Sequence, residues 1–208
     1  MGFEAIKLAK TAKMAVEVLA GVKPGENVCI ATDTNKLSIA QALAEACYAV
    51  GAETVICIMT PRQIHGEEIP PVLAGAMKAA QVVIAPTTYA LTHTRGRLAA
   101  SKAGARILIL REVTEDTFTS GAVSADYEEI YAITSRLVGR LDTASEIRMV
   151  TALGSDVRMS IAGRRGLCLA GLVRPPAWFA TLPSGEAAIA PIEGTAEGTI
   201  VVDHAIDS

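Results

Sequence analysis

The apolar positions in the first two-thirds of the chain alternate between helical and strand-like spacing. The first segment carries apolar side chains every three or four positions, which predicts a helix with one apolar face: Ile6, Ala9, Ala12, Val16 and Leu19. A continuous apolar run at 27–32 follows, as is typical of a strand buried on both faces. The alternation then predicts helices at 37–50, 71–80, 92–102 and 125–141, and strands at 54–59, 82–85 and 105–110.

This order of elements predicts the architecture of the first domain. Strands that alternate with helices of ordinary length form right-handed βαβ units, in which helices cover both faces of a parallel sheet. We therefore expect an α/β fold, with a Rossmann-like domain over residues 1–142.

The pattern changes after about Asp142. Strand-like runs at 147–152 and 157–161 are separated by the turn residues Gly154-Ser155-Asp156. Glycine and proline are dense beyond them, and helical periodicity does not return. We expect residues 143–208 to form the start of a second, β-rich domain that is incomplete in this chain.

Composition narrows the classes of partner. The 208 residues carry a formal net charge of −3 without a basic stripe, which argues against nucleic acid. No apolar run reaches membrane-spanning length, and no signal segment opens the chain. The four cysteines form no C-x-x-C pair, which favours buried thiols in a reducing compartment. We therefore expect a cytoplasmic protein without nucleic-acid or membrane partners.

Ligands of parallel sheets bind beyond the carboxyl ends of the strands, so the loops there are candidate sites. The loop at 31–35 is polar and opens a helix, so its backbone N–H groups could hold an anion. It lacks the glycine patterns of nucleotide-binding loops, and an ordinary capping loop is the alternative interpretation.

A second candidate loop, at 87–97, gathers hydroxyls, a histidine and two arginines. His93 can act as acid, base or hydrogen-bond donor, and Arg97 could pair with a substrate carboxylate. Thr92 is the expected N-cap of the following helix. We take Thr92, His93 and Arg97 as candidate substrate-binding residues and His93 as the candidate catalytic residue. A capped surface helix with solvated charges is the alternative.

The third candidate is the stiff segment 182–203, which places three glutamates among prolines and glycines: Glu186, Glu193 and Glu197. Carboxylates held on stiff loops are good metal ligands, so Glu186 is the candidate ligand. A solvated or capping glutamate is the alternative. His65, near Glu67 and Glu68, is interpreted as part of a surface loop.

Several segments together resemble the aminopeptidase T-type metallopeptidases, a family that includes 2,5-dihydroxypyridine 5,6-dioxygenase. The resemblance covers most of the chain from about residue 20, and the order of the segments is more specific than any one of them. They are Leu91-Thr-His-Thr-Arg-Gly-Arg97, Ala125-Asp-Tyr127, Val150-Thr-Ala-Leu-Gly-Ser-Asp156, Ala162-Gly-Arg164, Leu182-Pro-Ser-Gly-Glu186, Ala190-Pro191 and Gly198-Thr199.

The resemblance implies that the β-rich domain carries a divalent metal. In the peptidase branch, two ions (Zn, Co or Mn) activate water against a peptide carbonyl, and a ligand glutamate matches Glu186. In the dioxygenase branch, one Fe(II) is held by two histidines and a carboxylate, and a histidine that matches His93 helps to hold the aromatic substrate. The remaining ligands belong to a later half without a counterpart here, so we expect the 208-residue chain to be inactive alone.

Three functions follow as hypotheses. The first is a metal-dependent, aminopeptidase-like hydrolase of the leucyl aminopeptidase or aminopeptidase T type, acting on a small molecule or short peptide as a homodimer. The second is a ring-cleaving Fe(II) enzyme like 2,5-dihydroxypyridine dioxygenase. The third is a non-catalytic binding or oligomerisation module, whose unpaired strand edges join chains. Nucleotide binding by the 32–35 loop rests on fold analogy alone.

Overall fold

The chain forms two compact units in a computed structural model that describes residues 3–174 and 178–204. The first unit comprises Met1–Tyr131 and Leu169–Gly185, and the second comprises Ala132–Cys168 and Glu186–Ser208. Each unit has its own sheet structure.

The first unit is built on a five-stranded sheet in which every neighbouring pair is parallel. Its order is β2-β1-β3-β4-β8, formed by β1 (Asn27–Asp33), β2 (Glu53–Met59), β3 (Val82–Thr87), β4 (Arg106–Arg111) and β8 (Phe179–Thr181). The first four strands lie where the apolar runs predict them. The α/β class with a parallel sheet is therefore confirmed.

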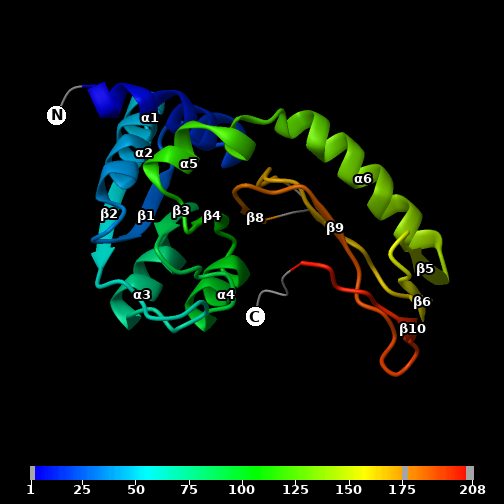
Figure 1. Ribbon diagram of the computed structural model, residues 1–208. Coiled ribbons are helices and arrows are strands. Elements are labelled where there is room, and N and C mark those ends of the chain that lie inside the picture. Colours follow the sequence, from blue (N-terminus) through cyan, green and yellow to red (C-terminus); the bar gives the residue numbers. More distant parts are fainter. Residues whose placement is uncertain (1–2, 175–177, 205–208) are drawn as a thin grey trace. The chain divides into compact units, whose positions relative to one another are not determined.

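Helices cover both faces of this sheet (Figure 1). One face is covered by α1 (Phe3–Met14), its continuation η1 (Ala15–Leu19), α2 (Leu37–Val50) and α5 (Glu115–Thr119). The other is covered by α3 (Pro71–Ala79) and α4 (Arg95–Lys102). A 3-10 turn, η2 (Gly121–Ser124), precedes the long helix α6 (Tyr127–Thr143).

The central strands divide their side chains between two hydrophobic cores, because successive residues of a strand point to opposite faces. Val28 and Ile30 of β1 join the core under α1 and α2, whereas Cys29 and Ala31 join the core under α3 and α4. Strands β3 and β4 alternate in the same way. Each large aliphatic side chain buried here contributes about 1.5–3 kcal/mol to the free energy of unfolding. Burial on both faces is therefore the main stabilisation of the sheet.

The second unit contains short strands. β5 (Glu146–Val150), β6 (Asp156–Ser160) and β10 (Glu197–Thr199) form an antiparallel sheet in the order β10-β6-β5, and β7 (Leu167–Leu169) pairs with β9 (Glu186–Ala188). The hairpin between β5 and β6 closes through a 3.0 Å hydrogen bond from Thr151 N–H to the Ser155 carbonyl. Both strands of this hairpin lie close to their predicted positions.

The division between the units differs from the boundary expected at residue 143. The chain enters the second unit within α6, and the segment Leu169–Gly185 returns to the first unit. It returns because Phe179 and Ala180 of β8 pair with Ile107 and Leu108 at the edge of the parallel sheet. A strand of three residues has too short a pattern to predict this pairing.

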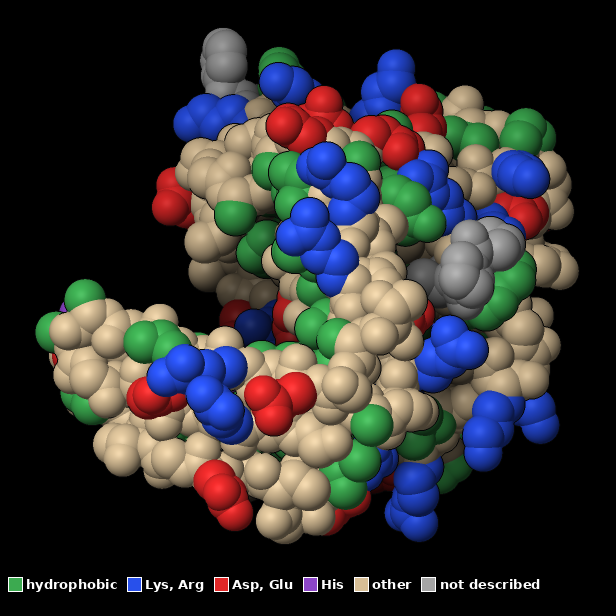
Figure 2. Space-filling model, turned by 90° about the vertical axis from the view of Figure 1, so that its right-hand side faces the viewer, with side chains coloured by type: hydrophobic (Ala, Val, Ile, Leu, Met, Phe, Trp, Pro, Cys, Tyr) green, Lys and Arg blue, Asp and Glu red, His purple; other side chains and the backbone are tan. Residues whose placement is uncertain are grey.

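Two features of the surface and the helices bear on partners. On the face shown in Figure 2, basic side chains lie in small groups among acidic, apolar and neutral ones. Within residues 3–174 and 178–204, no helix is both long enough and apolar enough to cross a membrane.

Candidate functional site

The switch point of the parallel sheet lies between β1 and β3. The chain leaves β1 for β2 on one side and later returns to β3 on the other, so the connections diverge between these two strands. A crevice at the carboxyl ends of such strands is the usual ligand site of an open parallel sheet. Asp33 ends β1, and Thr87 ends β3.

The fully buried carboxylate of Asp33 organises this edge. It accepts hydrogen bonds from Thr88 N–H at 2.6 Å, from the Thr88 hydroxyl at 3.0 Å and from Asn35 N–H at 3.0 Å. The Asn35 amide also donates to the Thr88 hydroxyl at 3.2 Å. Because a buried carboxylate is stable only when hydrogen bonds satisfy it, these contacts fix the two loops against each other.

This arrangement disfavours the anion site that the 31–35 loop could have formed and agrees with the alternative interpretation of an ordinary loop. Asn35 N–H, one of the groups that could have held a phosphate, already serves Asp33. A second negative group beside a buried carboxylate would be repelled, since the surrounding dielectric screens charges weakly. The loop is therefore better suited to a neutral polar group or a hydrogen-bond donor than to a nucleotide phosphate.

His65, interpreted from sequence as part of a surface loop, contacts the loop after β3. Its Nδ1 accepts a 3.0 Å hydrogen bond from Ala90 N–H, and Gly66 N–H donates to the Ala90 carbonyl at 3.0 Å. Its ring meets the Tyr89 ring edge-on, with centroids 5.2 Å apart. The loops after β2 and β3 are thus joined at the carboxyl edge of the sheet.

The hydrogen bond at Nδ1 assigns the tautomer of His65. A nitrogen that accepts a hydrogen bond carries no proton, so neutral His65 holds its proton on Nε2. Nε2 lies 3.6 Å from the Glu112 carboxylate, beyond the end of β4. Glu112 has a positive φ of 52°, a conformation that non-glycine residues seldom adopt and that is frequent at functional sites.

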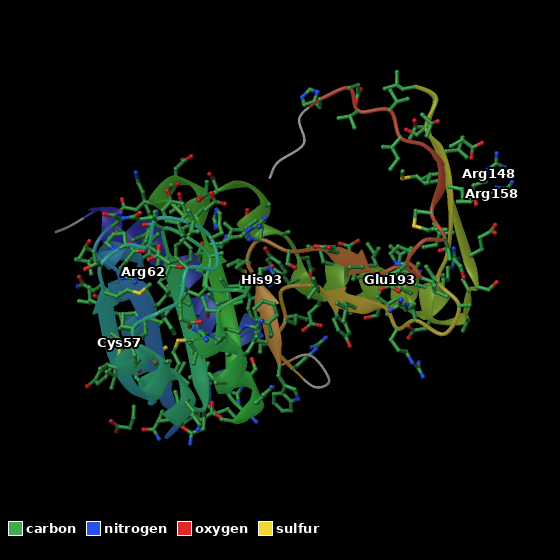
Figure 3. All side chains as sticks on the ribbon, turned by 90° about the horizontal axis from the view of Figure 1, so that it is seen from below. Cys57, Arg62, His93, Arg148, Arg158 and Glu193 are labelled. Atoms are coloured by element: carbon green, nitrogen blue, oxygen red, sulfur yellow. The ribbon has the colours of Figure 1, made fainter. Side chains whose placement is uncertain are left out.

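His93, labelled in Figure 3, lies on the loop between β3 and α4. Its side chain is exposed. Within the described part of the chain, no hydrogen bond to its ring is found. A Cβ placed on Gly66 would lie 3.9 Å from the Cβ of His93, so the loop that carries His65 runs beside it. Of the three residues predicted in this loop, Thr92, His93 and Arg97, His93 is the one whose side chain is exposed.

The guanidinium of Arg97 is already bound by other groups of the same chain. Its Nε donates to the Thr92 carbonyl at 2.8 Å, and its Nη1 donates to the Ser101 hydroxyl at 3.4 Å. The guanidinium lies over the Phe179 ring, 4.6 Å from the centroid, and burial lowers the pKa of Arg97. Arg97 therefore links α4 to the preceding loop and to β8.

The N-cap of α4 is Thr94 and not Thr92, which corrects the sequence-based expectation. The Thr94 hydroxyl accepts from Arg97 N–H at 3.2 Å, and the helix begins at Arg95. Thr92 instead contributes its carbonyl to Arg97. The two threonines stand two residues apart in Thr-His-Thr, so the pattern alone could not distinguish them.

The first turn of α4 also binds the carboxylate of Glu68. Arg95 N–H and Gly96 N–H donate to its two oxygens at 2.9 and 3.0 Å. Burial acts to raise the pKa of Glu68, but the backbone hydrogen bonds from Gly96 and Arg95 outweigh it and lower the pKa. The backbone N–H groups of Arg95 and Gly96, which have no acceptor within the helix, therefore donate to the Glu68 side chain.

Glu186, the predicted metal ligand, begins β9 in the second unit and is exposed. Glu193 pairs with Arg164, and Glu197 lies opposite Arg158 in the pairing of β10 with β6. Residues 3–174 and 178–204 contain no group of three or more His, Cys, Asp or Glu side chains that could hold a metal ion. A metal site needs several converging ligands, so the described residues do not by themselves fit the metal centre that the resemblance implies.

The first unit has a parallel sheet with polar side chains at its switch point, and the second consists of short strands. Together these features define a doubly wound α/β protein with an additional β-rich unit. A sequence model of the 2,5-dihydroxypyridine 5,6-dioxygenase (NicX) family matches residues 8–205. The chain therefore belongs to this family, as its sequence segments suggested.

Two solved structures share the fold. The 2,5-dihydroxypyridine dioxygenase from Pseudomonas putida KT2440 is 16% identical, with a TM-score of 0.72 over 94% of this chain and 59% of that chain. Wild-type AmpT from Thermus thermophilus is also 16% identical, with a TM-score of 0.64 over 93% of this chain and 63% of that chain. This chain thus spans about three-fifths of the length of both. No curated protein sequence matches it.

Proposed function

We propose that the chain supplies the substrate-binding edge of a metal-dependent, ring-cleaving dioxygenase that acts on a small hydroxylated heteroaromatic such as a dihydroxypyridine. The observation that carries the proposal is the exposed ring of His93 beside the His65 loop, at the carboxyl edge of a doubly wound sheet. The match to the dioxygenase family supports this branch.

The roles proposed for individual residues follow from their contacts. His93 donates or accepts a hydrogen bond at a substrate hydroxyl, and it is the candidate acid or base for moving that proton. Thr92 and Arg97 support the site mainly by shaping its loop, because Arg97 already binds the Thr92 carbonyl. Tyr89 and His65 offer aromatic rings beside this loop for a planar substrate.

A divalent metal is part of this proposal only because the family resemblance implies one. Zn, Co or Mn in the peptidase branch would take Glu186 as one ligand, whereas Fe(II) in the dioxygenase branch would be held by two histidines and a carboxylate. The described residues provide no set of ligands around Glu186.

Aminopeptidase activity is the second candidate. It is favoured by the fold shared with AmpT and by Glu186 in the Leu-Pro-x-x-Glu pattern. This function requires a short peptide as the substrate. The compartment we propose for both candidates is the cytoplasm, in keeping with the four free cysteines.

Calorimetric titration tests the proposal and separates the candidates. We expect 2,5-dihydroxypyridine to bind and a leucyl dipeptide not to bind. His93→Ala should weaken binding about tenfold, as expected for one lost hydrogen bond. Lys102→Ala, at the far end of the helix α4 that follows this loop, is the matched control. Binding of the dipeptide alone would favour the peptidase, whereas identical titrations for wild type and His93→Ala would refute the role of His93.

A further inference from the structure

Two of the four cysteines lie side by side in the parallel sheet. Cys29 belongs to β1 and Cys57 to β2, and their sulfur atoms are 4.0 Å apart. In the parallel register, Cys57 is paired with Ala31, two positions beyond Cys29. The two cysteines are therefore diagonal neighbours on the face of the sheet that α3 and α4 cover.

The core around this pair is rich in sulfur. Cys29 is buried, and Cys57, labelled in Figure 3, is partly exposed and packs against the same core. Met59 follows two positions after Cys57 on the same face of β2, and Met77 enters the core from α3. Two thiols and two thioethers thus belong to one apolar core, and these are the ligands that soft metal ions prefer.

A groove of about 440 Å³ leads from the surface to this part of the sheet. It is lined by Cys29 and Val55 of the sheet and by Ala76 and Ala79 of α3. A small ion can therefore approach Cys29 from solvent, although this residue is only 3% exposed. Cys57 offers a second approach because it is partly exposed.

The thiol of Cys29 holds its proton firmly. Burial, together with the neighbouring Cys57, raises the pKa of Cys29 to about 12. Since the thiolate is the form that attacks disulfides and binds metal ions, Cys29 is unreactive toward weak partners at neutral pH. The pair therefore suits an ion that binds sulfur strongly enough to displace a thiol proton.

The register of the strands disfavours a disulfide between these cysteines. Neighbouring strands lie about 4.8 Å apart and a strand advances about 3.3 Å per residue, so Cα atoms two positions out of register are about 8 Å apart. A disulfide requires Cα atoms within about 7 Å of each other. Forming one would have to shift β1 against β2, which are paired over seven residues each.

We propose that Cys29 and Cys57 bind a single soft monovalent metal ion of the Cu(I) class. Metal–thiolate bonds are about 2.3 Å long, so one ion bridges sulfurs that are 4.0 Å apart when the angle at the metal is about 120°. This is the angle of a three-coordinate ion, which leaves one position for a thioether of the same core. Met59 is the candidate for it, because it lies on the same strand face as Cys57.

Zinc fits this pair less well than Cu(I). A structural zinc ion takes four ligands, mostly cysteine thiolates and histidine nitrogens. Since residues 3–174 and 178–204 contain no metal-binding group of three or more His, Cys, Asp or Glu side chains, the pair lacks the further ligands that zinc requires. Thioethers, which the core does contain, select Cu(I).

Binding exchanges protons for the ion and transfers no electrons. One Cu(I) displaces both thiol protons, which pass to water, so the neutral pair gains one negative charge. The partial exposure of Cys57 keeps this charge in contact with solvent, which reduces the cost of burying it. The exchange requires neither dioxygenase nor peptidase activity, so the site is independent of the proposed function.

Competition with the chromogenic Cu(I) chelator bicinchoninate, under reducing and oxygen-free conditions, tests the site. We expect the wild-type chain to withdraw one Cu(I) from the chelator. Cys29→Ser and Cys57→Ser should each weaken binding at least about tenfold, since even the loss of an outer partner of a metal ligand costs about that much. Two matched controls should bind as wild type does: Cys47→Ser, buried like Cys29, and Cys168→Ser, partly exposed like Cys57.

X-ray absorption at the copper edge identifies the ligands independently of affinity, and it should find sulfur as the only neighbour of the ion. Circular dichroism checks that each variant is folded, and Cys57→Ser suffices for the test where Cys29→Ser is unstable, because Cys57 is partly exposed. Four results would each overturn the proposal: no Cu(I) held against the chelator, binding that Cys57→Ser leaves unchanged, an equal loss in Cys168→Ser, or nitrogen bound to the ion.

Discussion

The buried carboxylate of Asp33 accepts a 2.6 Å hydrogen bond from the backbone N–H of Thr88. Asp33 ends β1 and Thr88 follows β3, so this one contact fixes the distance between the two strands that border the switch point. The carboxyl edge of the sheet is thus held together by a buried carboxylate whose hydrogen bonds are all made within the chain.

Removing this carboxylate should destabilise the first unit. Asp33→Ala leaves the N–H groups of Thr88 and Asn35 without their acceptor, which should cost about 2–4 kcal/mol of unfolding free energy. Urea denaturation followed by circular dichroism measures it. Asp116→Ala, at an exposed aspartate, should stay within about 0.5 kcal/mol of wild type. Equal effects of the two substitutions would contradict the role of Asp33.

The two threonines around His93 should respond differently to substitution. Thr94→Ala removes the N-cap of α4 and should cost about 1 kcal/mol, whereas Thr92→Ala keeps the carbonyl that Arg97 binds and should cost less than about 0.5 kcal/mol. Thermal unfolding of both variants measures the difference. The opposite order would restore Thr92 as the cap.

Gly96 marks a close approach of α4 to the loop before α3. A Cβ at this position would lie 2.6 Å from Ile69 Cδ1 and 2.8 Å from Cγ1, so Gly96→Ala should cost about 1–3 kcal/mol. Gly75→Ala is the matched control, because Gly75 is also helical and a Cβ there meets nothing within 4 Å. That variant should gain about 0.5–1 kcal/mol from helix propensity. Chemical denaturation of both variants checks the predicted opposite signs.

The pair of Glu26 with Arg106 should make stability depend on acid pH. Burial acts to raise the pKa of Glu26, but the bidentate contact with Arg106, at 2.7 and 3.0 Å, contributes to a net lowering from 4.5. The stabilisation is therefore present above about pH 4.5 and is lost as pH falls through the lowered pKa. Glu26→Gln should lose about 1–2 kcal/mol at pH 7 and show a smaller decline into acid. Denaturation series from pH 7 to pH 3 compare the two slopes, and parallel slopes would exclude this contribution.

The alternating strands and helices of the first unit could be predicted because parallel strands are buried on both faces. A run such as Val28-Cys29-Ile30-Ala31 is apolar throughout for that reason, and Gly51 ends α2 with a left-handed φ of 86°. These are local patterns that lie wholly within the sequence of one element.

Contacts made through space could not be predicted in the same way. The hydrogen bond of His65 to Ala90 depends on two loops that meet only after the sheet has formed. The three residues of β8 have no periodicity to distinguish them from a loop. Residue type and resemblance predict four site residues: Thr92, His93, Arg97 and Glu186. The structure places the first three in the first unit and Glu186 in the second.

The late return of β8 has a consequence for synthesis of the chain. Strand β4 ends at Arg111, but its parallel neighbour begins at Phe179. During translation, the outer edge of β4 therefore stays unpaired on the order of ten seconds after β4 has emerged. Loop-closure entropy also delays this pairing relative to the contacts of β1 with β2 and β3. The sheet should thus fold in two stages on the ribosome, with β8 adding to four strands that have already paired.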